Sequence, residues 1–246
     1  MTALMIRELV TRFGRENIGF LWIMAEPLLF GGLVAILWSV MKGPEEHGIG
    51  IVAFVITGYL PLTLFRHAVS RCVSVFQINS SLMYHRQIHV LDFIFVRVLV
   101  EMIGTLMAFL FVGLGLIYFN LFPIPSDLGL FVAGFFLYGF FTLSVCLIIS
   151  PASEMSSALE KFVPVSTYIM VPFSGTFTMM SWLTPAARDV LMWSPPVHAM
   201  EMMRAGIFGE AVNPYYALAV PVGIPMILTL VGLFLCRTVR RHLVVE

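Results

Sequence analysis

Two long uncharged runs, separated by the single aspartate Asp127, decide the fold. Residues 102–126 read MIGTLMAFLFVGLGLIYFNLFPIPS, and residues 128–153 read LGLFVAGFFLYGFFTLSVCLIISPAS. A helix needs about 20 consecutive apolar residues to cross the hydrocarbon core of a bilayer. Each run is longer than that, so this stretch predicts two membrane-spanning helices joined by a tight connection.

The composition of the whole chain points the same way. Of its 246 residues, 59% are hydrophobic and 11% are charged, and the mean hydropathy is +0.95. Soluble domains carry about 25% charged residues, so this chain has too little polar surface for a water-soluble globule and too much apolar surface for a disordered chain. The 14 basic and 14 acidic residues balance, which leaves no basic stripe for a nucleic acid.

Four further uncharged runs predict the remaining spans. They cover residues 27–41, 48–65, 162–187 and 211–236. The first is short, but residues 17–25 extend it without a charge before Glu26. We therefore predict an all-α integral membrane protein with six transmembrane helices, forming a single permease domain over residues 1–246.

The basic residues of the short connections set the orientation. Arginines precede the first span, lie between the second and third, and close the chain, whereas the other side of the predicted membrane is mainly acidic. Because cytoplasmic loops carry the excess of Lys and Arg, both termini are predicted to be cytoplasmic.

Residues 2–17 predict an amphipathic helix lying in the plane of the membrane. Their apolar side chains fall on one arc at helical spacing, and Arg7, Glu8, Arg12 and Arg15 fall on the other. One interpretation is a topological anchor whose arginines touch lipid phosphates. The other is that Arg7, Arg12 and Arg15 steer an anionic, lipid-borne substrate toward a lateral opening.

A polar island at residues 78–90 lies between the second and third spans, and its Asn-Ser-Ser sequence at Asn79 is a helix N-cap signal. His85 and His89 have the spacing of a metal pair but no acidic or cysteine partner nearby, so a solvated cytoplasmic helix that docks another protein is favoured. The cysteines are three and far apart, so no metal site is predicted.

Charged residues also enter the third span. Arg97 and Glu101 are four residues apart, and residues at this spacing can pair on one face of a helix. Pairing near the cytoplasmic end is the favoured interpretation, and a role in transport is the alternative.

Residues 182–210, before the last span, are apolar yet carry prolines and charges. They predict two short amphipathic helices, broken at Ser194-Pro195-Pro196, that dip into the outer leaflet instead of spanning it. His198 and Glu201 resemble a catalytic pair, but the H-E-x-x-H pattern is absent, so a structural pairing is favoured.

The source of energy is predicted to lie outside this chain. The sequence contains no G-x-x-x-x-G-K-[ST] phosphate loop, so any ATP must be hydrolysed by a partner. The uncharged runs of the last three spans disfavour an ion-coupled carrier, and no G-x-S-x-G elbow indicates a hydrolase. The chain is not expected to be an enzyme by itself.

Two motifs carry a resemblance to a known family. They are RELVTRF at residues 7–13, followed by IGFLWIMAEPLL at residues 18–29, and WSPPVHAMEMMRAGIFG at residues 193–209. Together they resemble the polysaccharide-export permeases of the type-2 ABC exporter superfamily, and most closely those that export capsular polysaccharide in Gram-negative bacteria. One departure is Ser194, where relatives often have Asn.

The resemblance implies a homodimer in the bacterial inner membrane, bound to two nucleotide-binding ATPase subunits that hold ATP and Mg. It also implies a periplasmic adaptor and an outer-membrane channel as partners, and a lipid-linked polysaccharide as cargo. Residues 2–17 would be the interface helix, residues 78–90 the coupling helix and residues 182–210 the periplasmic gate helices. The coupling residues would be Asn79, Ser80, Ser81, Leu82, Met83, Tyr84, His85 and Arg86. The gate residues would be Trp193, Pro195, Pro196, His198, Glu201 and Arg204.

A channel for a sugar chain should offer aromatic faces and scattered hydroxyls without a deep charged site. Candidates on the first, second and fifth spans are Trp22, Phe30, Trp38, Phe54, Tyr59, Tyr168, Phe173, Ser174 and Phe177. The alternative for each is contact with lipid or with the protein core.

Two other functions stay open from the sequence. One is an export permease of the same superfamily with another cargo, such as O-antigen, teichoic acid or a drug. The other is a passive channel or ion-coupled carrier that needs no nucleotide-binding partner.

Overall fold

The computed structural model describes residues 4–8, 19–43, 45–79 and 89–243. Its long helices are α2 (Gly19–Lys42), α3 (Ile51–Cys72), α6 (Val90–Tyr118), α7 (Leu128–Met155), α8 (Ser157–Phe173) and α11 (Ala219–Leu243). Its short helices are α4 (Val75–Ile78), η1 (Met180–Trp182), α9 (Pro185–Leu191), α10 (Pro195–Phe208) and η2 (Gly209–Ala211). Residues 4–8 are also helical.

A small hairpin connects α2 to α3. Strands β1 (Glu45–Glu46) and β2 (Ile49–Gly50) pair antiparallel, with Glu46 opposite Ile49. His47 and Gly48 between them have φ angles of 54° and 78°. Two successive positive φ angles are what a type I′ hairpin turn requires.

Four helices of the described chain, α3, α6, α7 and α11, are long and apolar enough to cross a membrane. This confirms the prediction of an all-α membrane protein. The other two predicted spans correspond to α2, with 24 residues, and α8, with 17. Within the described part of α2, only Leu29–Met41 is found as a short apolar helix, and α8, at 1.5 Å per residue, is about 26 Å long, less than the hydrocarbon core of about 30 Å. The six-span topology therefore stays a prediction.

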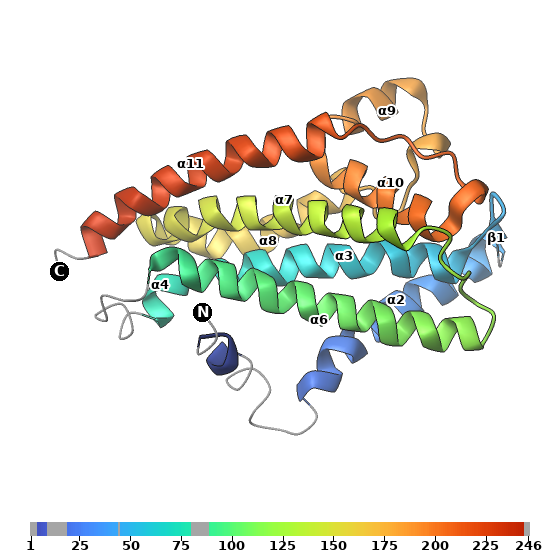
Figure 1. Cartoon of the computed structure of the whole chain (residues 1–246), viewed down its shortest axis with the longest axis horizontal. Helices are drawn as coiled ribbons and strands as arrows, with labels where there is room; N and C mark the ends of the chain where they lie inside the picture. Colours follow the sequence, from blue (N-terminus) through green and yellow to red (C-terminus); the bar gives the residue numbers. More distant parts are fainter. Residues whose placement is uncertain (1–3, 9–18, 44, 80–88, 244–246) are drawn as a thin grey trace.

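The long helices run side by side along the longest axis of the molecule (Figure 1). α3 packs against α2, α6, α7 and α8, and α7 packs most extensively against α11 and α10. Residues 4–8, α4 and the end of α11 lie at one end of the bundle, which we call the α4 end (Figure 1). The hairpin, α9 and α10 lie at the opposite end, the α10 end.

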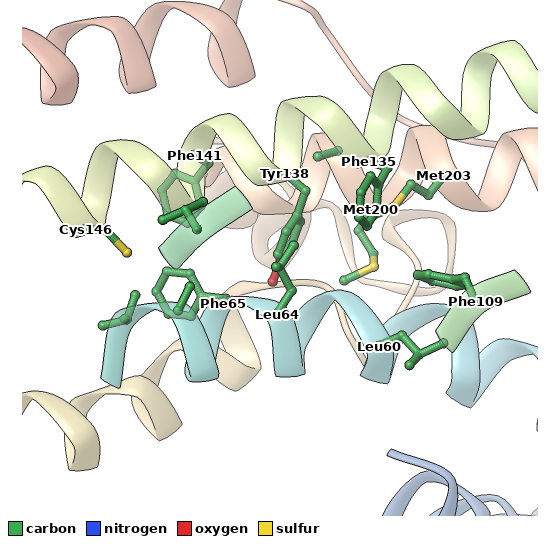
Figure 2. Packing of buried hydrophobic residues seen from close by; sticks show 14 of the residues in the cluster. Leu60, Leu64, Phe65, Phe109, Phe135, Tyr138, Phe141, Cys146, Met200 and Met203 are labelled. Atoms are coloured by element: carbon green, nitrogen blue, oxygen red, sulfur yellow. The ribbon is translucent and has the colours of Figure 1, made fainter. Parts of the chain in front are cut away.

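Aromatic side chains fill the space between α3 and α7 (Figure 2). The rings of Phe65 and Phe141 stack with their centroids 5.7 Å apart, and Tyr138 is buried beside Leu64. Nearer the α10 end, Met200 of α10 lies beside Phe135 of α7 (Figure 2). Since lipid tails are as apolar as these side chains, close packing more than exclusion from water holds such helices together.

The ends of the helices follow local caps and turns. α7 begins where predicted, because the Asp127 carboxylate accepts a hydrogen bond from the Leu130 N–H at 3.0 Å. α6 begins earlier than the uncharged run, because the Asp92 carboxylate accepts the His89 N–H at 2.9 Å. Such N-terminal caps satisfy N–H groups that have no partner within the helix.

The predicted bounds of the fifth span, residues 162–187, are wrong. α8 covers Ser157–Phe173, with Pro172 in its last turn, and Gly175 follows with a φ angle of 71°. A left-handed residue cannot continue a right-handed helix. Ser174 and Phe177 therefore lie in the loop after the fifth helix and not on it.

Glycine allows α7 and α10 to approach closely. A Cβ atom built on Gly206 of α10 would lie 2.6 Å from the Asp127 carbonyl oxygen and 2.5 Å from the Phe131 nitrogen. The Gly206 carbonyl itself accepts the Asp127 N–H at 2.8 Å. A side chain at Gly206 would have to push the two helices apart.

Gly206→Ala is expected to destabilise the protein by about 2 kcal/mol, the usual cost of overpacking a tight contact. The matched control is Gly223→Ala on α11, where a Cβ atom meets nothing within 4 Å. Thermal unfolding of both variants in detergent checks this. Equal melting temperatures for the two variants would contradict the close contact.

Candidate functional site

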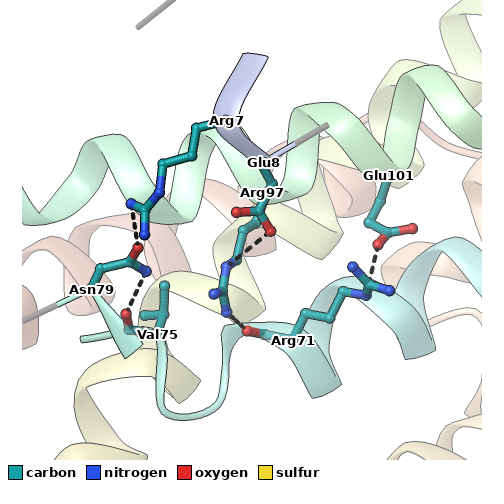
Figure 3. Close-up of polar contacts among 7 residues, drawn as sticks. All are labelled: Arg7, Glu8, Arg71, Val75, Asn79, Arg97 and Glu101. Carbon is teal, nitrogen blue, oxygen red and sulfur yellow. Dashed lines mark hydrogen bonds and ion pairs between the residues drawn. The ribbon is translucent and has the colours of Figure 1, made fainter. Parts of the chain in front are cut away.

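At the α4 end, residues 4–8, which we call the N-terminal turn, contact the start of the predicted coupling segment (Figure 3). Arg7 Nη1 donates to Asn79 Oδ1 at 3.2 Å, and Asn79 Nδ2 donates to the Val75 carbonyl at 2.8 Å. Asn79 is buried and is the C-cap residue of α4. The helix that its Asn-Ser-Ser sequence predicts to follow it falls outside the described residues. Residues Ser80 to Arg86, and Arg12 and Arg15, lie outside the described residues.

Arg97 joins the same turn to α6 and α3 (Figure 3). Its Nε lies 3.5 Å from Glu8 Oε1, and its Nη1 donates to the Arg71 carbonyl. The predicted pairing of Arg97 with Glu101 is therefore wrong. Spacing along one helix shows only which neighbours are near, whereas the ion-pair partner of Arg97 comes from the N-terminal turn.

Glu101 forms an ion pair with Arg71 of α3 and lies near His67 of the same helix. Its carboxylate is 3% exposed and lies 3.2 Å from Arg71 Nε and 3.9 Å from His67 Nδ1. A carboxylate inside a helical bundle requires such partners, because an unpaired charge there costs several kcal/mol of insertion free energy, about 2.5–3.5 kcal/mol on translocon scales. The pair links α6 to the end of α3 that leads into α4.

A second contact ties α4 to α8, the fifth predicted span. Ser74, the residue before α4, donates its hydroxyl to Glu160 Oε1 of α8 at 2.6 Å. Ser74 has a φ angle of 55°, which is uncommon for a residue with a side chain. α4 is thus joined to the N-terminal turn through Asn79 and to α8 through Ser74, so a displacement of α4 would be felt by both.

The two short helices predicted in residues 182–210 are present, as α9 and α10, with a break before Pro195. Their surroundings differ from the prediction. None of the residues of α9 is buried, whereas all 14 residues of α10 are. α10 is packed against α7, α11 and α3, so it is an internal helix and not an amphipathic surface helix.

Three polar side chains of α10 bind backbone groups from the surrounding loops. They are His198, Glu201 and Arg204, spaced so that they share one face of the helix. Glu201 accepts the N–H of Met180 at 3.1 Å and that of Tyr215 at 3.0 Å. We call these three residues the α10 clamp, because they hold the loops before and after α10 to it.

Arg204 makes the largest number of these contacts. It is fully buried and donates to the carbonyls of Gly175 at 2.7 Å and Thr178 at 3.1 Å, and also to that of Thr176. Its guanidinium carbon lies 3.9 Å from the centre of the Phe54 ring. Burial lowers the pKa of Arg204 to about 10 and nearby Glu201 raises it, so the guanidinium stays charged at neutral pH.

Gly58 of α3 makes room for this arrangement. A Cβ atom at Gly58 would lie 2.2 Å from the Thr176 carbonyl oxygen and 2.7 Å from Arg204 Nη2. No pattern in the sequence distinguishes Gly58 from the other glycines of the spans. It was missed because its neighbours come from a loop more than one hundred residues later in the chain.

His198 is held in one neutral form. Its Nδ1 accepts the Ala217 N–H at 3.0 Å, so the proton lies on Nε2, which is 2.8 Å from the Met192 carbonyl oxygen. α10 lies outside the long apolar helices, and burial lowers the pKa of His198, opposed by its bond to the Met192 carbonyl. Protonation of Nδ1 would remove the acceptor of the Ala217 N–H.

Stability is therefore expected to fall on acidification. Because the folded pKa of His198 lies below the unfolded value of about 6.5, the unfolded chain takes up a proton first, and stability decreases below that pH by at most about 1.4 kcal/mol per pH unit. Thermal unfolding at about pH 7.5 and about pH 5.5 measures this. His198→Gln keeps a donor and an acceptor without titrating, and an equal acid loss in that variant would contradict the assignment.

The other predicted gate residues divide between surface and interior. Trp193 is 75% exposed, whereas Pro195 and Pro196 are buried at the start of α10. Ser194 is the N-cap residue of α10, but its hydroxyl donates to the Phe173 carbonyl at 2.6 Å and makes no capping bond to α10. Ser194 thus ties the α9–α10 turn to the end of α8.

The predicted channel residues also divide into two groups. Phe30, Tyr168 and Phe173 are exposed in the protomer, at 49%, 59% and 46%. Phe54, Tyr59 and Ser174 are buried inside it. Trp38 and Phe177 are half-buried against each other, with ring centroids 5.7 Å apart, and the side chain of Trp22 lies outside the described part of the chain.

Within the described residues, no group of three His, Cys, Asp or Glu side chains could hold a metal ion. His89, one half of the pair considered from the sequence, lies 3.9 Å from the carboxylate of Asp92, and His85 is outside the described residues. The described contacts are ion pairs and hydrogen bonds to the backbone, which hold helices and loops in register.

Long apolar helices, an ion-paired network at one end and a buried polar clamp at the other define the class as a multi-pass helical membrane protein. The sequence family of ABC-2 type transporters matches residues 1–208. The chain belongs to this family, whose members are the membrane part of a transporter and carry no nucleotide-binding site themselves.

Relatives match most of the chain. It is 36% identical over 218 residues to the capsule polysaccharide export inner-membrane protein CtrC of Neisseria meningitidis serogroup B, covering 87% of this chain and 82% of the relative. It is 32% identical over 237 residues to BexB of Haemophilus influenzae, a protein with the same description, covering 96% and 89%. It is 27% identical over 239 residues to the polysialic acid transport protein KpsM of Escherichia coli, covering 95% and 89%.

Proposed function

We propose that this chain is the inner-membrane permease subunit of an ATP-driven exporter, and that it moves lipid-linked capsular polysaccharide out of the cytoplasm. The observation that carries the proposal is similarity over nearly the whole chain to proteins described as capsule polysaccharide export inner-membrane proteins. ATP and Mg are then bound by a separate ATPase subunit. Two permease chains and two ATPase subunits would form the transporter, with a periplasmic adaptor and an outer-membrane channel beyond it.

The topology of the proposal has six spans: α2, α3, α6, α7, α8 and α11. In support, the N-terminal turn and the last turns of α11 lie at the same end of the bundle (Figure 1), as an even number of crossings requires. That end is rich in arginine, which favours the cytoplasm. α9, α10 and the hairpin then face the periplasm.

The α4 end is proposed to receive the force. The coupling segment, Asn79 to Arg86, leaves directly from α4, and α4 is joined to the N-terminal turn and to α8. When the ATPase subunits close on ATP, they would push this segment. The contacts of Asn79 and Ser74 would carry the movement to the interface helix and to the fifth span.

The Glu8–Arg97 pair allows this transmission to be tested. Glu8→Arg and Arg97→Glu each place like charges together, and each is expected to lower export about tenfold, the effect of about 1.4 kcal/mol. The double swap restores opposite charges and should recover most of the export. Surface polysaccharide per permease in the membrane is the measurement, and a double swap as defective as the single variants would remove this pair from the mechanism.

The channel and gate are proposed to lie along α2, α8 and the α10 end. Of the predicted channel residues, Phe30, Tyr168 and Phe173 offer aromatic faces outside the protomer, where a second copy could complete a conduit. The α10 clamp would keep the periplasmic loops rigid while the spans move. Trp193 is exposed on the turn between α9 and α10, and it would be the gate residue that contacts an emerging glycan.

The proposal is tested in the organism that carries the gene. Deletion of the gene should leave polysaccharide inside the cell and remove it from the surface, and the intact gene should restore it. A tagged copy should also retain an ATPase subunit during purification. Normal surface capsule in the deletion strain would overturn the proposed cargo.

A further inference from the structure

Arg66 of α3 lies under the ring of Tyr168 on α8. Its guanidinium carbon is 4.1 Å from the centre of that ring. Tyr168 is 59% exposed, so the pair forms part of the outer surface of the protomer between the second and fifth spans.

The donors of Arg66 are unused within the described residues. Its Nε is buried without a hydrogen-bond partner, as are the Nε atoms of Arg97 and Arg204. Unlike those two arginines, Arg66 also has no hydrogen bond or ion pair from its other nitrogens to a carboxylate or carbonyl of the described residues. Arg71 and Arg97 by contrast face carboxylates, and Arg204 donates to three carbonyls. Arg66 is half-buried, and the Tyr168 ring covers its guanidinium without accepting its N–H groups as an anion would. Unpaired donors at membrane depth are unfavourable, so this position favours the binding of an anion.

The position of Arg66 suits the end of a lipid-borne molecule. It lies six residues before the end of α3 at Cys72, which is about 9 Å along the helix axis. Lys161 and Tyr168 are seven residues apart on the exposed face of α8, two turns of one helix. A second cation thus stands between Arg66 and the α4 end, on the side from which a cytoplasmic substrate would arrive.

We propose that Arg66 and Tyr168 form the site that receives an oxyanion, a phosphate or carboxylate, at the membrane-proximal end of the exported glycolipid. This rests on the proposed function and adds to it the chemical group that the permease recognises. The planar guanidinium binds two oxygens of such a group at once, and the Tyr168 ring fixes the plane in which it does so. Lys161 attracts the anion without needing a fixed geometry.

A phospholipid of the bilayer offers the same oxyanion, so the experiment separates the two sources. The permease is purified together with its ATPase partner in phosphatidylcholine nanodiscs, and dodecyl phosphate is titrated and followed by its ³¹P NMR signal. Arg66→Gln is expected to weaken binding about tenfold and Arg66→Lys about threefold, because lysine keeps the charge but cannot bind two oxygens at once as the planar guanidinium does. Arg237→Gln is the matched control, since Arg237 is an exposed arginine in the C-terminal part of α11, which lies at the α4 end.

Equal binding of dodecyl phosphate by wild type and Arg66→Gln would overturn the proposal. So would displacement of dodecyl phosphate by phosphatidylglycerol in the discs, which would assign the site to bilayer lipid. Undiminished affinity in discs with phosphatidylglycerol supports a site for the cargo.

Export in cells separates this inference from the function on which it rests. Surface polysaccharide should fall about tenfold in Arg66→Gln, in proportion to the lost binding, and stay normal in Arg237→Gln. Normal export by Arg66→Gln would overturn the inference and leave the proposed function intact. A wild-type protein that binds dodecyl phosphate through Arg66 but exports no polysaccharide would overturn the proposed function alone.

Discussion

Arg204→Leu is expected to lower the free energy of unfolding by about 3–5 kcal/mol, which few single substitutions do. The side chain is fully buried and donates to the carbonyls of Gly175, Thr176 and Thr178. Leucine fills part of the volume but leaves these carbonyls without donors, and each buried, unpaired carbonyl costs about 1–3 kcal/mol. Loss of the contact with the Phe54 ring adds to the effect.

Thermal and denaturant unfolding in detergent measure this loss. Arg204→Lys keeps the charge but reaches fewer carbonyls, so its free energy of unfolding should lie between those of the wild type and Arg204→Leu. Arg237→Leu removes an exposed arginine and should change stability by less than about 0.5 kcal/mol. Wild-type stability in Arg204→Leu would show that the α10 clamp does not hold the loops.

Replacing both Tyr84 and His85 by glycine is expected to abolish most of the export while the protein still inserts in the membrane. Each glycine costs a helix about 0.5 kcal/mol relative to tyrosine or histidine. Two of them disfavour a docked coupling helix by about 1 kcal/mol, which is about fivefold in the population that can receive force from the ATPase.

Surface polysaccharide and copurification of the ATPase subunit report on this variant. The matched control places two glycines at Asn120 and Leu121, in the loop between α6 and α7 at the α10 end, where Asn120 already has a φ angle of 56°. That control should export normally. Normal export by the Tyr84/His85 variant would remove the segment from the coupling mechanism.

Much of the helical framework could be predicted, because apolar runs and caps are local signals. α7 begins where predicted, since its uncharged run starts immediately after the capping residue Asp127. α8 was misplaced because its apolar run continues beyond Phe173, where Pro172 and the left-handed Gly175 end the helix. Hydropathy shows which residues tolerate lipid. The helix can end while the sequence stays apolar, so hydropathy does not show where it ends.

The contacts of the site were harder to predict, since most partners are distant in sequence or belong to the backbone. The spacing of Arg97 and Glu101 favoured a pair between them, yet Arg97 is paired with Glu8 and Glu101 with Arg71. His198, Glu201 and Arg204 were predicted as gate residues on surface helices, with His198 paired to Glu201. That pairing is wrong, because both side chains bind backbone groups, and backbone carbonyls and N–H groups leave no trace in a sequence. Arg66 was counted only as a topological charge, because nothing nearby in the sequence indicates Tyr168.

Reconstitution into proteoliposomes tests the central claim, that this chain forms a conduit driven by a separate ATPase. Vesicles are prepared with the permease alone, with permease and ATPase subunit, and with an ATPase subunit unable to hydrolyse ATP, and movement of lipid-linked polysaccharide across the bilayer is measured. We expect movement only when permease, active ATPase subunit and ATP are all present. Movement of the polysaccharide by the permease alone would contradict the account.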